Sequence, residues 1–88
     1  MELRQLKYFI TSADTLNFTE AARQCFITQS TLSQQIKQLE TELGVQLFER
    51  IGKRVFLTET GRDFLSYARQ TVADAEYGVQ RIKDMEEQ

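Results

Sequence analysis

The residues best suited to chemistry in this chain are neutral amides and hydroxyls gathered between positions 28 and 41. No acidic residue occurs between Glu20 and Glu40, so no carboxylate on this stretch would repel a phosphate. Amides and hydroxyls both donate and accept hydrogen bonds, as the base edges in a DNA major groove require. Glutamine matches the paired donor and acceptor of adenine, and serine or threonine suits several bases. A polar face of this kind is also common on helices that only face solvent, so the segment has two interpretations.

A second acid-free window, from Arg50 to Thr58, concentrates positive charge. It holds Arg50, Lys53 and Arg54 in or beside a turn predicted at Gly52. Basic side chains at a loop tip often serve only solubility. Next to the acid-free polar helix they favour DNA, because a cationic tip reaches a minor groove or the sugar-phosphate backbone.

The composition excludes other kinds of site. The chain has no His, which removes His-based general acid–base catalysis, Ser–His and Cys–His nucleophiles and imidazole metal ligands. The single Cys25 forms neither an internal disulfide nor a thiolate cluster, and we expect a small buried hydrophobe. Glu40 and Glu42 are two residues apart and face different sides of a helix. We therefore expect no enzyme, no catalytic residue, no metal and no cofactor.

The chain is long enough for one small domain. Its 88 residues are 41% hydrophobic, which is too few apolar side chains for two cores. No apolar run approaches the ~20 residues that span a bilayer, so we expect no membrane partner and a cytoplasmic location. The chain contains no proline, so long helices are allowed almost everywhere.

Helical spacing of apolar residues predicts three helices in the first half of the chain. The first runs from about residue 3 to residue 16, and the second starts near Asn17, capped by Thr19 or by Asn17 paired with Glu20. The side chains expected to face inward from the second helix are Phe18, Ala21, Ala22 and Cys25.

A third helix and a hairpin follow. Thr28 is placed to cap a helix that runs to about residue 43, and Gly44 ends it. Its apolar stripe is Leu32, Ile36, Leu39 and Leu43. The period then changes, and residues 46–50 and 54–57 are typical of two short strands around a turn. A short helix, a tight turn and a second helix form a helix-turn-helix pattern, and the hairpin makes it a winged variant.

From residue 58 onward the pattern is helical throughout. Six apolar residues recur at alternating spacings of three and four, which is a heptad seam. They are Leu65, Ala68, Val72, Ala75, Val79 and Ile82. A helix of this length extends roughly 45 Å, longer than so small a domain can cover. We therefore expect the distal seam to pair with a second chain.

The net charge of −2 combines two unlike parts. Residues 1–57 hold seven basic and six acidic side chains, for a net charge of +1. Residues 58–88 hold four basic and seven acidic side chains, for a net charge of −3. The acidity therefore belongs mainly to the final helix and does not exclude DNA. The modest positive charge elsewhere predicts modest non-specific affinity, with more of the binding left to dimerisation and groove contacts.

Several separated blocks of the chain carry a family resemblance. They are Leu3–Phe9 (LRQLKYF), Phe18–Ala22 (FTEAA), Thr28–Ile36 (TQSTLSQQI), Leu39–Gly44 (LETELG), Leu47–Arg50 (LFER) and Leu57–Gly61 (LTETG). In order and spacing, over about residues 2–67, these blocks resemble the N-terminal region of bacterial LysR-type transcriptional regulators. The tail 68–88 resembles the linker helix of that family by position and period.

The resemblance implies a mainly α fold: a winged helix-turn-helix over residues 1–58, with three helices and a short β-hairpin wing, and a linker or dimerisation helix over residues 59–88. The recognition helix, about 29–43, would enter the major groove, and the wing, about 50–55, would meet the adjacent minor groove or backbone. The implied partner is double-stranded DNA carrying an inverted-repeat promoter site. A homodimer would bind this site. Its two subunits would contact each other through antiparallel C-terminal helices, and full-length members commonly form tetramers.

The resemblance also assigns roles to individual residues. The implied base-contacting residues are Gln29, Ser30, Thr31, Ser33 and Gln34. The implied backbone or wing contacts are Thr28, Lys37, Arg50, Lys53 and Arg54. This chain departs from many members, which have Pro at position 30 or 31 and Arg or Lys at position 34. A neutral Gln34 is expected to weaken a guanine or phosphate contact there and to favour adenine.

Members of the family carry a C-terminal domain that binds a small-molecule inducer. Nothing in these residues corresponds to it, so we expect a separated DNA-binding part with no small-molecule ligand in this segment. The alternative interpretation is a helical protein-interaction module that uses the Leu65–Ile82 seam. The seam suits either interpretation, whereas the acid-free windows and the resemblance favour DNA.

Overall fold

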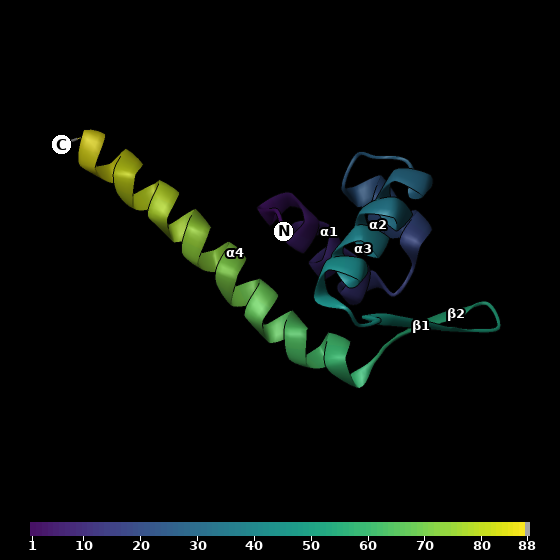
Figure 1. The fold of residues 1–88 in the computed structure, drawn as a ribbon. Coiled ribbons are helices and arrows are strands. Elements are labelled where there is room, and N and C mark those ends of the chain that lie inside the picture. Colours follow the sequence, from purple (N-terminus) through teal and green to yellow (C-terminus); the bar gives the residue numbers. More distant parts are fainter. Residues whose placement is uncertain (88) are drawn as a thin grey trace.

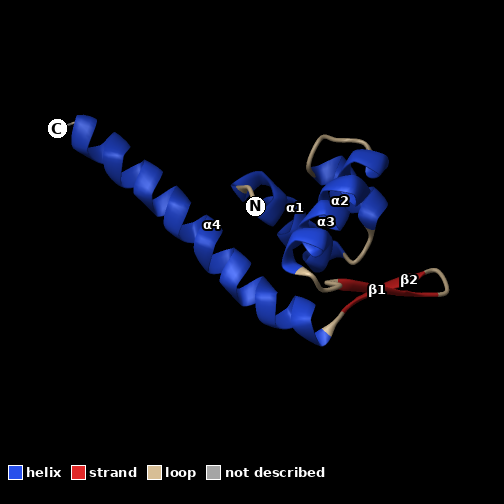
Figure 2. Cartoon of the chain, in the orientation of Figure 1, coloured by secondary structure: helices blue, strands red, loops and turns tan. Residues whose placement is uncertain are grey.

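The computed structural model describes residues 1–87, which form four helices and a two-stranded antiparallel hairpin (Figures 1 and 2). Three short helices pack together, the hairpin projects from them, and a long helix leads away to the C-terminus. The elements are α1 (Leu3–Thr15), α2 (Phe18–Gln24), α3 (Gln29–Leu43), β1 (Phe48–Ile51), β2 (Arg54–Leu57) and α4 (Glu59–Glu86). Gln88, the last residue of the expected final helix, lies outside the described residues.

The helix boundaries follow from capping side chains. Asn17 caps α2 by accepting a hydrogen bond from the Glu20 backbone N–H at 3.0 Å, so of the two predicted caps Asn17 is confirmed and Thr19 lies inside the helix. Thr28 caps α3 as predicted, and Gly44 ends it in the left-handed conformation with φ 73°. These side chains satisfy backbone groups that a helix end leaves unpaired.

The core lies where α1, α2, α3 and the start of α4 meet. Phe9, Leu32 and Leu39 are fully buried, and Ala21 is as well, which lets the neighbouring helices approach closely. Cys25 is half-buried rather than buried, so the prediction of a core cysteine was wrong. The reason is its place as the C-cap of α2, where the chain leaves the packed helix face.

The wing pairs Phe48 with Leu57 at its base and Ile51 with Arg54 at its tip. The tip is a two-residue turn whose first residue, Gly52, has φ 63°, the position at which type II′ hairpin turns use glycine. The first strand begins later than the predicted residue 46. Leu47 is instead a fully buried core residue that precedes the strand.

The base of the wing is fastened to the start of α4. The Thr58 hydroxyl donates to the carbonyl of Gln46 at 2.7 Å and accepts from the Gly61 N–H at 2.9 Å. A Cβ atom at Gly61 would lie 2.3 Å from the carbonyl oxygen of Leu47. Only glycine allows this approach, so α4 starts in a fixed position relative to the wing.

The structure divides the predicted seam of α4 into two parts. Ala68 and Val72 are buried in the core of their own chain, and Leu65 packs against it. An ion pair between Arg69 and Asp14 joins the same part of α4 to α1. Farther along, Val79 and Ile82 are 56% and 59% exposed. The proximal seam residues are therefore covered by their own domain, and the distal ones are exposed. The pairing of the distal seam with a second chain stays a prediction.

Candidate nucleic-acid interface

The polar face of α3 is exposed along its length. Gln29, Thr31, Gln34 and Lys37 are exposed, as is Ser30, while Ser33 is half-buried. Ser30, Thr31, Gln34 and Lys37 lie away from the buried apolar stripe, which anchors the helix to α1 and α2. Gln29 and Ser33 lie at the edge of that stripe, seven and three residues before Ile36. The structure therefore places all the residues predicted to contact bases on one helix, and the apolar side of that helix packs in the core.

The hydroxyls at the start of α3 form a short hydrogen-bonded chain. The Thr28 hydroxyl accepts from the Thr31 N–H at 3.1 Å and donates to Thr31 Oγ1 at 2.8 Å. Its oxygen also lies 3.2 Å from Ser30 Oγ. Because Thr28 has a single hydroxyl proton, Ser30 must be the donor in that pair. The Thr28 hydroxyl is thus fully used, Thr31 keeps its own proton to donate, and Ser30 keeps its acceptor lone pairs.

The side chain of Gln29 is oriented by the neighbouring helix. Gln29 is the first residue of α3, and its Oε1 accepts a hydrogen bond from the Thr19 hydroxyl of α2 at 2.9 Å. No local pattern predicts this contact, because the two residues are ten positions apart and lie on different helices.

The basic residues gather beside this face. Arg50, Lys53 and Arg54 are exposed on the wing. The Arg50 guanidinium lies 4.8 Å from the centre of the Phe18 ring, a cation–π contact that directs it toward α2. Between α3 and the wing is an open hollow of about 250 Å³ that both Lys37 and Arg50 line. Two elements that are distant in sequence thus bring two cations to one concave surface, which Glu40 also lines.

Glu40 holds the loop before the wing, a role that the sequence analysis missed. Its Oε2 accepts from the backbone N–H of Leu47 at 2.7 Å and from that of Phe48 at 3.3 Å. The carboxylate thereby joins α3 to the first strand of the wing and sets their relative position. The sequence indicates this role only weakly. Glu40 stands four residues before Gly44, which ends the helix, and the loop that follows has backbone N–H groups that need acceptors.

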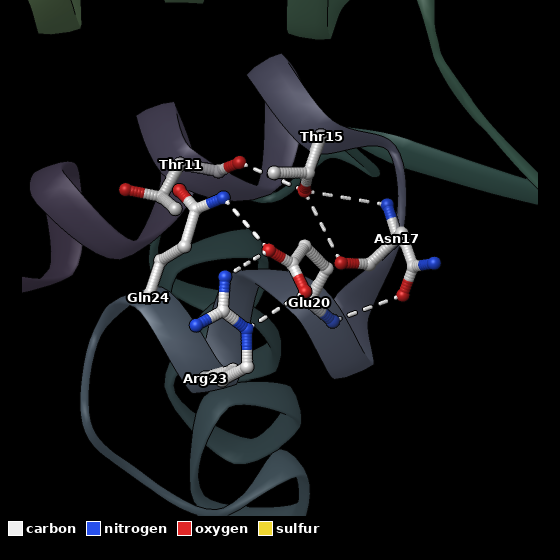
Figure 3. A network of polar contacts seen from close by, with 6 residues as sticks. All are labelled: Thr11, Thr15, Asn17, Glu20, Arg23 and Gln24. Carbon is white, nitrogen blue, oxygen red and sulfur yellow. Dashed lines mark hydrogen bonds and ion pairs between the residues drawn. The ribbon is translucent and has the colours of Figure 1, made fainter.

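A polar network on α2 neutralises one of the nearby cations (Figure 3). Arg23 donates to both carboxylate oxygens of Glu20, and Gln24 donates to the same carboxylate at 3.2 Å. The hydrogen bond from Arg23 lowers the pKa of Glu20 from its ordinary 4.5 to about 2, with a smaller contribution from Gln24. Arg23 therefore adds little net charge to this side of the molecule.

Within residues 1–87, no group of three or more His, Cys, Asp or Glu side chains is arranged to hold a metal ion. None of the helices over these residues is long and apolar enough to cross a membrane.

The fold and the surface together define a winged helix-turn-helix domain with a long C-terminal helix. Residues 3–62 match the model of the lysR family of bacterial regulatory helix-turn-helix proteins, and the chain belongs to that family.

Relatives agree with this assignment. The chain is 52% identical over 73 residues to the HTH-type transcriptional regulator YwqM and 48% identical over 80 residues to AlsR, both of Bacillus subtilis (strain 168). The alignments cover 83% and 91% of this chain but 25% and 26% of those proteins, so the chain spans about a quarter of their length.

Solved structures of the same family superpose over nearly the whole chain. The BenM DNA-binding domain, in its complex with catB site 1 DNA, has a TM-score of 0.94 and 39% identity, covering 99% of this chain and 94% of that one. The CbnR DNA-binding domain, also in complex with DNA, has a TM-score of 0.91 and 38% identity, covering 97% and 98%. The predicted mainly α winged helix-turn-helix fold with a long final helix is confirmed.

Proposed function

We propose that this chain is the DNA-binding part of a bacterial transcriptional regulator that acts in the cytoplasm on double-stranded promoter DNA. In this proposal α3 lies in the major groove, and the wing lies at the adjacent minor groove or backbone. The observation that carries it is the continuous surface from the polar face of α3 to the wing, where Lys37 and Arg50 line one hollow. The regulators of known structure that this chain resembles include two bound to DNA.

The roles of individual residues follow from their places on this surface. Gln29, Ser30, Thr31, Ser33 and Gln34 are proposed to read base edges, since they share the exposed side of α3. The proposed phosphate and wing contacts are Lys37, Arg50, Lys53 and Arg54, together with the backbone at Thr28. The Thr28 hydroxyl is occupied by the helix cap, where it accepts from the Thr31 N–H. The N–H groups of Gln29 and Ser30 in the first turn of α3 have no partner within the helix and suit a phosphate.

We propose further that two copies pair through α4 and bind the two halves of an inverted repeat, with a tetramer as the assembly of a full-length regulator. The distal seam supports this pairing, since Val79 and Ile82 are more than half exposed. The earlier seam residues Leu65, Ala68 and Val72 pack in the core of their own domain. Met85, 54% exposed, follows Ile82 at a spacing of three and lies beside the seam, whose next heptad position is Glu86.

A gel-shift series tests DNA binding. The chain is titrated into a DNA fragment selected from a random pool and into a scrambled version of that fragment, at several salt concentrations. Retardation that is stronger on the selected fragment and weakens with salt is expected. No retardation at low salt, or binding that is independent of salt, would contradict the proposal.

Sedimentation of a matched pair of variants tests the dimer. Val79→Asp places a charge in the exposed seam and is expected to give a monomer. Tyr77→Asp is the control, because Tyr77 is 75% exposed and lies off the seam, so the dimer is expected to persist. Pairing through α4 would be refuted if the wild-type chain sedimented as a monomer at concentrations of tens of micromolar, a range that would populate a dimer of moderate dissociation constant.

A further inference from the structure

A hydrogen bond between two helices orients the side-chain amide of Gln29. Its Oε1 is held toward α2 by the Thr19 hydroxyl at 2.9 Å. The oxygen and nitrogen of a planar carboxamide point in directions roughly 120° apart, so an oxygen held toward α2 leaves Nε2 pointing away from that helix. Among residues 1–87, no side chain or carbonyl accepts a hydrogen bond from Gln29 Nε2.

The polar residues nearest to Thr19 on α2 do not compete for Gln29. Glu20 is held by Arg23 and Gln24, which hydrogen bond to its carboxylate (Figure 3). Thr19 is exposed, and its hydroxyl has no other partner in the described chain. Within residues 1–87, the hydrogen bond of this hydroxyl therefore goes to the Gln29 amide alone.

From this geometry, and resting on the proposed function, we propose that Thr19 is a positioning residue that makes Gln29 a hydrogen-bond donor toward DNA. A base read by a donor must offer an acceptor at its major-groove edge, namely guanine N7 or O6, thymine O4 or adenine N7, whereas cytosine offers none. Pairing with both the 6-amino group and N7 of adenine needs the amide oxygen and nitrogen directed at the same edge. The contact with Thr19 disfavours that arrangement, although glutamine taken alone suits adenine.

Selection from a random DNA pool identifies the base that Gln29 reads. The position at which Gln29→Ala loses its preference is the Gln29 position, and wild type is expected to disfavour cytosine there, because cytosine offers only a donor at that edge. Thr19→Val keeps the shape of the side chain but removes the hydroxyl, so adenine is expected to gain roughly fivefold relative to wild type, the equivalent of one neutral hydrogen bond. Thr19→Ser keeps the hydroxyl and is expected to select as wild type does.

A base analogue provides the second readout. In a site carrying adenine at the Gln29 position, adenine is replaced by purine, which lacks the 6-amino group. Wild type and Thr19→Ser are expected to bind both sites equally, whereas Thr19→Val is expected to lose roughly fivefold on the purine site. Thr19→Ala serves as a second hydroxyl-free variant, and thermal unfolding verifies that each variant is folded.

The outcomes separate the two proposals. A wild-type preference for cytosine at that position, or a wild-type loss on the purine site equal to that of Thr19→Val, overturns the donor role of Gln29. Thr19→Ser behaving like Thr19→Val, or base preferences unchanged in Thr19→Val, overturns the role of Thr19. A wild-type chain that retards no DNA refutes the proposed function itself.

Discussion

The contribution of Lys37 to DNA binding is open to a quantitative test through salt. Lys37, Arg50, Lys53 and Arg54 are exposed at the proposed interface, and none forms an ion pair within residues 1–87. Each phosphate neutralised on B-DNA releases counterions and adds about −0.9 to the slope of log K against log salt. Four such cations per subunit predict a slope of about −7 for a dimer.

Replacing Lys37 with alanine removes two cations from the dimer. The slope is expected to become about −5.5, and affinity is expected to fall equally on specific and scrambled DNA. Gln29→Ala is the matched control, since it removes a neutral side chain from the same face. It is expected to weaken specific binding by about 1–3 kcal/mol, with little change on scrambled DNA and an unchanged slope.

Fluorescence anisotropy with labelled specific and scrambled duplexes between about 50 and 200 mM salt, where such slopes are well resolved, measures both quantities. Equal losses from the two substitutions on both duplexes would refute the distinction between phosphate and base contacts. A wild-type slope near −2 would refute the set of four contacts, because most of these cations would then lie away from the DNA.

Further outcomes are expected for stability and titration. Leu16 ends α1 with φ 50° and is 41% exposed, so Leu16→Gly is expected to raise the free energy of unfolding by about 0.5–1 kcal/mol in thermal denaturation. Gly61→Ala places a Cβ atom 2.3 Å from a backbone carbonyl and is expected to destabilise the domain by about 1–3 kcal/mol in urea unfolding. Glu40→Ala leaves two part-buried N–H groups without an acceptor and is expected to cost about 1–3 kcal/mol, with Glu40→Gln retaining more stability; equal values for both would contradict the acceptor role. Because the pKa of Glu20 is about 2, its ion pair supports the fold fully above pH 4.5 and loses that support as pH falls toward 2. In a carboxyl NMR titration, Arg23→Gln is expected to raise the pKa of Glu20 toward 4.5, with the Gln24 hydrogen bond still lowering it.

Local signals in the chain determined most of the secondary structure. The cap at Thr28, the stop at Gly44 and the turn at Gly52 were each predicted from neighbouring residues and are each confirmed. The reason is that caps, helix ends and turns depend on side chains within a few positions of the backbone groups that they satisfy. The same holds for the face of α3, because helical spacing alone separates its polar residues from its apolar stripe.

Contacts between distant residues were decided only by the tertiary structure. The burial of Ala68 and Val72 shows this, because a regular heptad pattern cannot tell a seam that covers its own domain from one that covers a partner. Cys25 shows it at smaller scale, since its residue type favoured the core and its place at a helix end kept it half-exposed.

The candidate site divides in the same way. The sequence by itself determined which residue types lie on the outward side of α3 and which cations lie near the wing, because periodicity and composition are local properties. Only the tertiary structure brought the Glu40 carboxylate to the loop before the wing, Arg50 to the Phe18 ring and the Thr19 hydroxyl to Gln29. Hydrogen bonds and cation–π contacts act over a few ångströms, so their partners are determined by how the helices and the hairpin pack and not by the order of residues along the chain.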